Sequence, residues 1–80
     1  MIVTLRSTTK IVSLKTKQGS ATEIPTRIWE GKTESGIKVH AYITRIAVTD
    51  DENQEEFARE LAQCTSPSKE VEAIPLRMIL

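Results

Sequence analysis

The chain has 80 residues, of which 39% are apolar and 28% are charged, and its eleven basic and eleven acidic side chains give a formal net charge of zero. This length and composition predict one small globular domain, residues 1–80, and exclude a disordered or multidomain chain. Purely apolar runs such as Met78-Ile79-Leu80 are far shorter than the roughly 20 residues of a membrane span, so we expect no membrane association.

The charges are distributed unevenly along the chain. Residues 1–48 have a net charge of +5 and residues 49–80 a net charge of −5. If the two halves form different faces, the molecule is an electrical dipole; chance patchiness is the alternative. The single cysteine, Cys64, excludes an internal disulfide, and the N-terminus lacks the pattern of a signal peptide. We therefore expect a cytoplasmic location.

The N-terminal segments predict a β-hairpin followed by a loop. Residues 2–6 and 10–15 are rich in β-branched and apolar side chains that alternate with polar ones, which is typical of strands. Ser7-Thr8-Thr9 between them suits a turn. Residues 16–22 show no apolar periodicity and predict a loop.

A second hairpin is predicted at the centre of the chain. Residues 24–30 indicate a strand, and Pro25 near its start favours an edge or a bulge. Residues 31–36 are polar, include two glycines and predict the connecting loop. Residues 37–48 give the strongest strand signal, although the alternation changes phase at Arg45. A bulge, or burial of both faces at the far end of the strand, explains that change.

A helix is predicted over residues 49–64. Thr49 and Glu52 fit a capping box, and the acidic residues beside them suit the positive end of the helix dipole. One narrow apolar stripe consists of Phe57, Leu61 and Cys64. A stripe of this width is enough to pack the helix against a sheet.

Residues 70–80 predict a last strand, because alternate apolar residues share one face at a period of two. The complete order is four strands, one helix and one strand. We therefore predict an α+β fold with a mostly antiparallel sheet of about five strands and the helix packed on one face.

Catalytic and metal-binding chemistry lack the residues that they need. The chain has one histidine, His40, and one cysteine, Cys64, which lies near the predicted C-terminal end of a helix, where a thiol is less reactive. The sequence Gly31-Lys32-Thr33 resembles the end of a phosphate-binding loop but lacks the earlier glycine and the helix. We predict no catalytic residue, no metal and no cofactor, and the protein is not expected to be an enzyme.

The outer face of the central hairpin is the predicted binding site. If Glu30 lies opposite Val39, then Trp29 lies opposite His40 and Arg27 opposite Tyr42. The predicted site consists of Arg27, Trp29, Lys38, His40 and Tyr42. Trp, Tyr and Arg dominate the energetics of protein interfaces. With the register shifted by one residue, Trp29 would instead belong to the core, and the loop length does not decide between the two.

Basic residues of the N-terminal segment indicate an alternative ligand. They are Arg6, Lys10, Lys15 and Lys17. Beside aromatic rings, such cations bind the phosphates of single-stranded nucleic acid. The net charge of zero and the three aromatic residues argue against this reading, and scattered solvated lysines explain the same pattern.

Our sequence-based interpretation is a small non-catalytic accessory or regulatory protein, similar in size to inhibitors and adaptors. It would bind another protein through the hairpin surface or a sheet edge. A homodimer is the companion prediction, and a nucleic-acid-binding module is the alternative.

Overall fold

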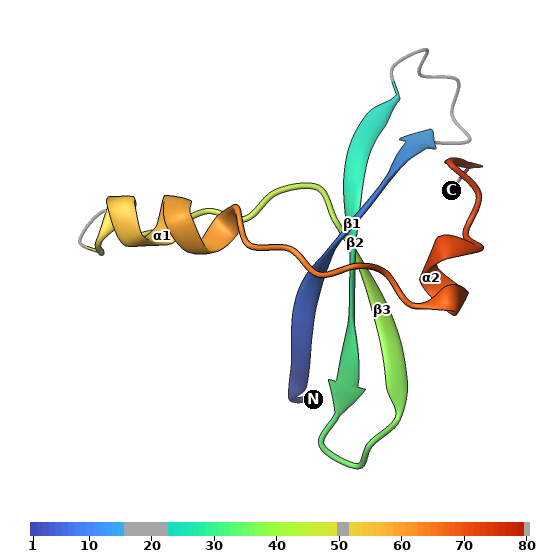
Figure 1. Cartoon of the computed structure of the whole chain (residues 1–80), viewed down its shortest axis with the longest axis horizontal. Helices are drawn as coiled ribbons and strands as arrows, with labels where there is room; N and C mark the ends of the chain where they lie inside the picture. The colour runs from blue at the N-terminus through green and yellow to red at the C-terminus, as the bar shows by residue number, and fades with distance from the viewer. Residues whose placement is uncertain (16–22, 50–51, 80) are drawn as a thin grey trace.

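The computed structural model describes residues 1–15, 23–49 and 52–79, and they form the predicted α+β fold (Figure 1). The elements are β1 (Val3–Lys15), β2 (Ile24–Thr33), β3 (Lys38–Ile43), α1 (Gln54–Leu61), α2 (Lys69–Glu72) and β4 (Arg77–Ile79). One sheet has the order β3-β2-β1-β4, in which only β1 and β4 run parallel. Within the described residues the sheet thus has four strands rather than about five. The predicted loop at 16–22 lies outside them.

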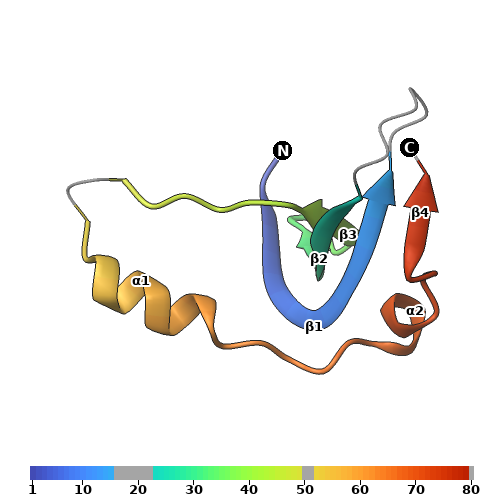
Figure 2. The ribbon, with the colours of Figure 1, turned by 90° about the horizontal axis from the view of Figure 1, so that it is seen from above.

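The predicted N-terminal hairpin is a single bent strand, β1, which pairs with β2 along both of its halves (Figure 2). Ser7 lies opposite Trp29 and Ile11 opposite Arg27, so three residues of β1 face one residue of β2. The buried hydroxyl of Thr8 donates to the Ile28 carbonyl at 2.7 Å. The same hydroxyl accepts a hydrogen bond from the backbone N–H of Lys10 at 3.2 Å. The Ser-Thr-Thr run therefore produces a bulge, because the Thr8 hydroxyl bonds backbone groups that leave the ladder there.

The hairpin between β2 and β3 closes with a three-residue loop. Thr33 N–H donates to the Ile37 carbonyl and Gly36 N–H donates to the Thr33 carbonyl, both at 3.0 Å. Gly36 has a φ of 89°, a conformation that favours glycine. In common three-residue hairpin loops the last residue, usually glycine, adopts this left-handed conformation, as Gly36 does here.

This loop length selects, of the two registers left open by the sequence, the one that is shifted by one residue. Trp29 lies opposite Ala41, and Glu30 lies opposite His40. Opposite residues of an antiparallel pair share one face of the sheet, so a shift of one residue exchanges the faces. Trp29 therefore shares a face with Ala41 and not with His40. Ile28 lies opposite Tyr42 and shares a face with it.

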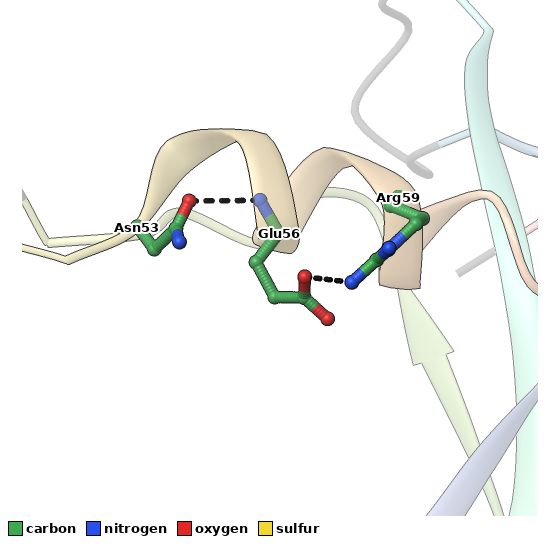
Figure 3. A network of polar contacts seen from close by, with 3 residues as sticks. All are labelled: Asn53, Glu56 and Arg59. Carbon is green, nitrogen blue, oxygen red and sulfur yellow. Dashed lines mark hydrogen bonds and ion pairs between the residues drawn. The ribbon is translucent and has the colours of Figure 1, made fainter.

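Helix α1 is shorter than predicted and does not cover the sheet. Its N-cap is Asn53 rather than Thr49, and the Asn53 side chain accepts from Glu56 N–H at 3.0 Å (Figure 3). Glu56 also forms an ion pair with Arg59. None of the eight residues of α1, all of which the structure describes, is buried. The helix projects away from the strands (Figures 1 and 2), contrary to the expectation that it packs on one face.

The predicted C-terminal strand is replaced over its first part by α2. Ser68 caps this helix by accepting from Val71 N–H at 3.3 Å. The Val71 side chain is fully buried, whereas Leu76 is 66% exposed. Only β4 at the end of the segment is a strand, and it pairs with the C-terminal half of β1. Local capping by Ser68 thus overrides the alternating apolar pattern.

The core lies on one face of the sheet. Its buried apolar residues within the described part are Val12, Leu14, Ile28 and Val71. We call the face that carries Ile28 the core face, and the face that carries Trp29 the open face. In the described residues no helix has the length and apolar character needed to cross a membrane.

Candidate functional site

A polar groove lies on the core face, beyond the end that α2 covers. Its volume is about 950 Å³. Its floor consists of two rows of residues that lie directly opposite one another in β1, β2 and β3. The first row is Thr4, Lys32 and Lys38, and the second is Arg6, Glu30 and His40. The segment 65–70 also lines the groove. We call this surface, with its four basic residues Arg6, Lys32, Lys38 and His40, the basic groove.

Glu30 joins the floor of the basic groove to its wall. Its Oε2 accepts from the backbone N–H of Ser68 at 2.9 Å. Hydrogen bonds from the Ser68 hydroxyl and N–H, followed by the charges of His40 and Arg6, lower the pKa of the Glu30 carboxyl and outweigh its partial desolvation. Glu30 is therefore ionised at neutral pH and fixes the segment that leads into α2.

Lys32 and Lys38 are the charges of the groove that the sheet brings together. They lie directly opposite each other in neighbouring strands, a position in which like charges destabilise a sheet. On the wall, Glu70 has a lowered pKa, caused by its own N–H, the Ser68 hydroxyl and the charge of Lys38. The groove thus has three permanent cations, two carboxylates and the imidazole of His40.

A glycine in the groove floor allows β1 and β2 to approach closely. A Cβ added at Gly31 would lie 1.8 Å from the carbonyl oxygen of Thr4 and 2.9 Å from the Cα of Leu5. Both are backbone atoms, so neither can turn aside. The floor in its present form requires glycine at this position.

A second hollow lies against the open face, next to α1. Its volume is about 430 Å³. Its apolar residues are Trp29, Ile46, Phe57, Leu61 and Cys64. We call this surface the Trp29 cleft. The predicted stripe of α1 faces into it, but Leu61 stays 46% and Ile46 37% exposed, so the cleft is an apolar surface that is only partly covered.

Arg27 lies at the same face and is engaged within the chain. Its Nη1 donates to the carbonyl oxygen of Thr8 at 2.7 Å and to the sulfur of Cys64 at 3.3 Å. These bonds tie the segment after α1 to the bulge of β1. Arg27 therefore positions the wall of the Trp29 cleft, and its guanidinium is already bonded.

The structure divides the predicted binding site between two faces. Lys38, His40 and Tyr42 are on the core face, where the first two line the basic groove. Arg27 and Trp29 are on the open face. Trp29 is half-buried. It is therefore neither a core residue nor a fully exposed one, the two alternatives that the sequence left open. The three-residue loop with Gly36 separates the set, because it places Trp29 opposite Ala41.

The alternative set of basic residues is not gathered at one surface of the described residues. Arg6 lines the basic groove, whereas Lys10 Nζ donates to the backbone carbonyl of Glu72 at 2.9 Å. Lys15 lies at the far end of β1, and Lys17 is outside the described residues. Binding of single-stranded nucleic acid remains a prediction. The basic residues named for it do not form a continuous path on the described surface.

The residues of the basic groove that sequence reasoning missed include Lys32, Glu30, Ser68 and Glu70. The signal for Lys32 was present, because it lies as far before the Glu34-Ser35-Gly36 loop as Lys38 lies after it. A three-residue loop with glycine last would have paired the two lysines. The contact of Ser68 with Glu30 joins residues far apart in sequence and had no local signal.

Across residues 1–15, 23–49 and 52–79, no group of three His, Cys, Asp or Glu side chains is arranged to hold a metal ion. Comparison with known proteins yields no matching family model, no matching curated protein and no matching solved structure.

Proposed function

We propose that this chain is a small non-catalytic accessory or regulatory protein that binds an acidic, extended segment of another protein at the basic groove and the adjoining edge of β3. The observation that carries the proposal is the direct opposition of Lys32 and Lys38 in the floor of the groove. Two ammonium groups in this position repel each other and cost the isolated sheet stability. A bound carboxylate between them would turn that cost into a favourable interaction.

The edge of the sheet supports an extended ligand. β3 is outermost in the strand order, and no described strand pairs with its outer side. An extended peptide can add to such an edge through backbone hydrogen bonds. Its alternate side chains would then lie beside Lys38, His40 and Tyr42, which share the core face. Tyr42 is 41% exposed and offers an aromatic contact next to the charges.

The acidic residues of the groove favour a peptide over a nucleic acid. Glu30 and Glu70 line the groove between and beside the cations. They would repel a backbone with a charge at every phosphate, whereas a peptide can present N–H donors to them and carboxylates to the lysines. The stacking surface for bases is also small, since Trp29 lies on the open face and Tyr42 on the core face.

The test is a titration of a fluorescein-labelled oligoglutamate peptide, followed by anisotropy at low salt. Binding should weaken on the order of tenfold in Lys32→Glu/Lys38→Glu, because each reversal replaces an attraction with a repulsion. The control Lys15→Glu/Arg45→Glu has the same net charge but changes exposed positions outside the groove. It should bind like the wild type, and added salt should weaken binding in all active variants.

Equal affinity in the groove variant and in its control would reject the proposal. A single-stranded oligonucleotide of the same charge is the second arm of the titration. If it binds more tightly than the peptide and is equally sensitive to Lys32 and Lys38, the nucleic-acid alternative replaces the protein-binding one.

A further inference from the structure

The chain is more open than a compact protein of its size. Its accessible surface is 6377 Å², whereas a compact chain of 9.0 kDa exposes about 4,800 Å². Its radius of gyration is 14.2 Å, against about 11.6 Å for a compact chain of this length. Roughly 1,500 Å² of surface is thus in excess of what a closed monomer of this mass would expose.

The core is correspondingly small. Within the described residues four apolar side chains are buried, all on or against the core face. On the other side of the sheet, α1 extends from the strands (Figure 2). Its apolar stripe is only partly covered, since Leu61 is 46% exposed. Ile11 of β1, on the open face, is 47% exposed. A chain of this size with so few buried side chains gains little stability from packing.

From these observations we infer that two copies of this chain associate through the open face, with the Trp29 cleft of each covered by the other. The area agrees with this occupant, because a standard stable interface buries about 800 Å² per partner. That amount fits within the excess surface of each copy. In a dimer with a two-fold axis, each copy covers the same patch of the other, so neither patch stays free to bind a third molecule.

The charge distribution favours a second copy over an unrelated partner. The chain has no net charge, but its first 48 residues have +5 and the remainder −5. Two such molecules do not repel each other as a whole, and a two-fold arrangement of the clefts can bring the acidic helix of one copy toward Arg6 of the other, which also lines the cleft. Helix α1, with Glu55, Glu56 and Glu60, borders the cleft and belongs to that acidic segment.

This inference is tested separately from the proposed function. Arg6 and Thr65 line both the Trp29 cleft and the basic groove, but the two lysines changed in the peptide titration line the groove alone. Lys32 and Lys38 are absent from the lining of the Trp29 cleft. The two proposals therefore fail separately. Loss of peptide binding leaves the dimer unaffected, and loss of the dimer leaves the lysines in place.

The test is sedimentation equilibrium over a wide concentration range, together with the emission of Trp29, the single tryptophan. We expect a monomer–dimer equilibrium, with Trp29 emission at shorter wavelength in the dimer because water leaves the cleft. Leu61→Lys should raise the dimer dissociation constant about a hundredfold, since it places a charge in an apolar interface. Lysine is a good helix former and suits a helix C-terminus, so α1 should persist.

The matched control is Leu76→Lys, which changes a leucine that is 66% exposed and lies outside the cleft. It should dimerise like the wild type. If Leu61→Lys proves unfolded, thermal unfolding of the wild type tests the dimer instead. The Tm of a protein that dimerises as it folds rises with protein concentration. A wild-type monomer at all concentrations with constant Trp29 emission, or an equal effect of both leucine variants, overturns the inference.

Discussion

Gly31 shows how one residue sets the shape of the groove floor. Replacement by alanine puts a Cβ 1.8 Å from the Thr4 carbonyl oxygen, so the backbones of β1 and β2 must separate. We expect Gly31→Ala to lower the free energy of unfolding by about 1–3 kcal/mol, the usual cost of overpacking. Urea denaturation measures this change.

Gly36→Ala is a useful comparison, because an added Cβ there meets no atom within 4 Å and only the φ of 89° opposes it. A Gly31→Ala midpoint equal to that of the wild type would contradict the close approach.

Glu30 makes stability depend on pH through its bond to Ser68. Its pKa is lowered in the folded state, so its contribution is complete above the unfolded value of about 4.3 and is lost as the pH falls through the lowered pKa. The difference in Tm between the wild type and Glu30→Gln should therefore be largest near neutral pH and should shrink in acid. Thermal unfolding at a series of pH values measures it. The Glu30 charge acts to raise the pKa of Glu70, so the same comparison is made in a Glu70→Gln background, where only Glu30 differs. A difference that is constant with pH would show that the Glu30 charge has no role.

At the scale of single elements, α1 depends on its own local contacts. Helices of this length are marginal in isolation, and none of the described residues of α1 is buried. What holds its first turns are the Asn53 cap and the ion pair of Glu56 with Arg59 (Figure 3). The pair is exposed and contributes little, so the cap is the more important contact.

Asn53→Ala should destabilise α1 by about 1 kcal/mol, the typical value of an N-cap. Amide hydrogen exchange should then speed up in residues 54–61, while the sheet amides keep their protection because α1 does not support the core. Asn53→Asp retains an acceptor oxygen at the cap and should exchange like the wild type. Uniformly faster exchange throughout β1 and β2 would indicate instead that α1 packs more firmly than its exposure suggests.

Strand β1 shows why element boundaries are hard to derive locally. The sequence Ser7-Thr8-Thr9 interrupts the alternation of apolar residues, which is a sign common to turns and bulges. The bulge forms because β2 lies beside both halves of β1 and supplies the Ile28 carbonyl for the Thr8 hydroxyl.

At the scale of the whole molecule, the sheet has two faces with different chemistry. The core face combines a small apolar core with the basic groove, and the open face combines the Trp29 cleft with α1. The proposals assign a separate contact to each face, a partner peptide to the first and a second copy to the second.

Residue types and local patterns by themselves determined the α+β class and the hairpin at the centre of the chain. The loop is shorter than the predicted 31–36, because β2 continues to Thr33, and β3 ends at Ile43 rather than at residue 48. The same patterns also singled out Lys38 and His40, which line the groove. These features depend on side-chain alternation, glycine placement and helix-forming stripes, all of which act over a few neighbouring residues.

Only the tertiary structure decided which face each residue occupies and which segment covers the core. The three-residue loop that ends at the left-handed Gly36 placed Trp29 and His40 on opposite faces of the sheet, whereas the predicted site has both on one face. Ser68 caps α2 and bonds Glu30 from a distant part of the chain, so α2 rather than α1 supplies the buried Val71 of the core. The physical reason is that strand faces alternate with a period of two. A change of one residue in the loop length therefore moves every side chain of the following strand to the other face.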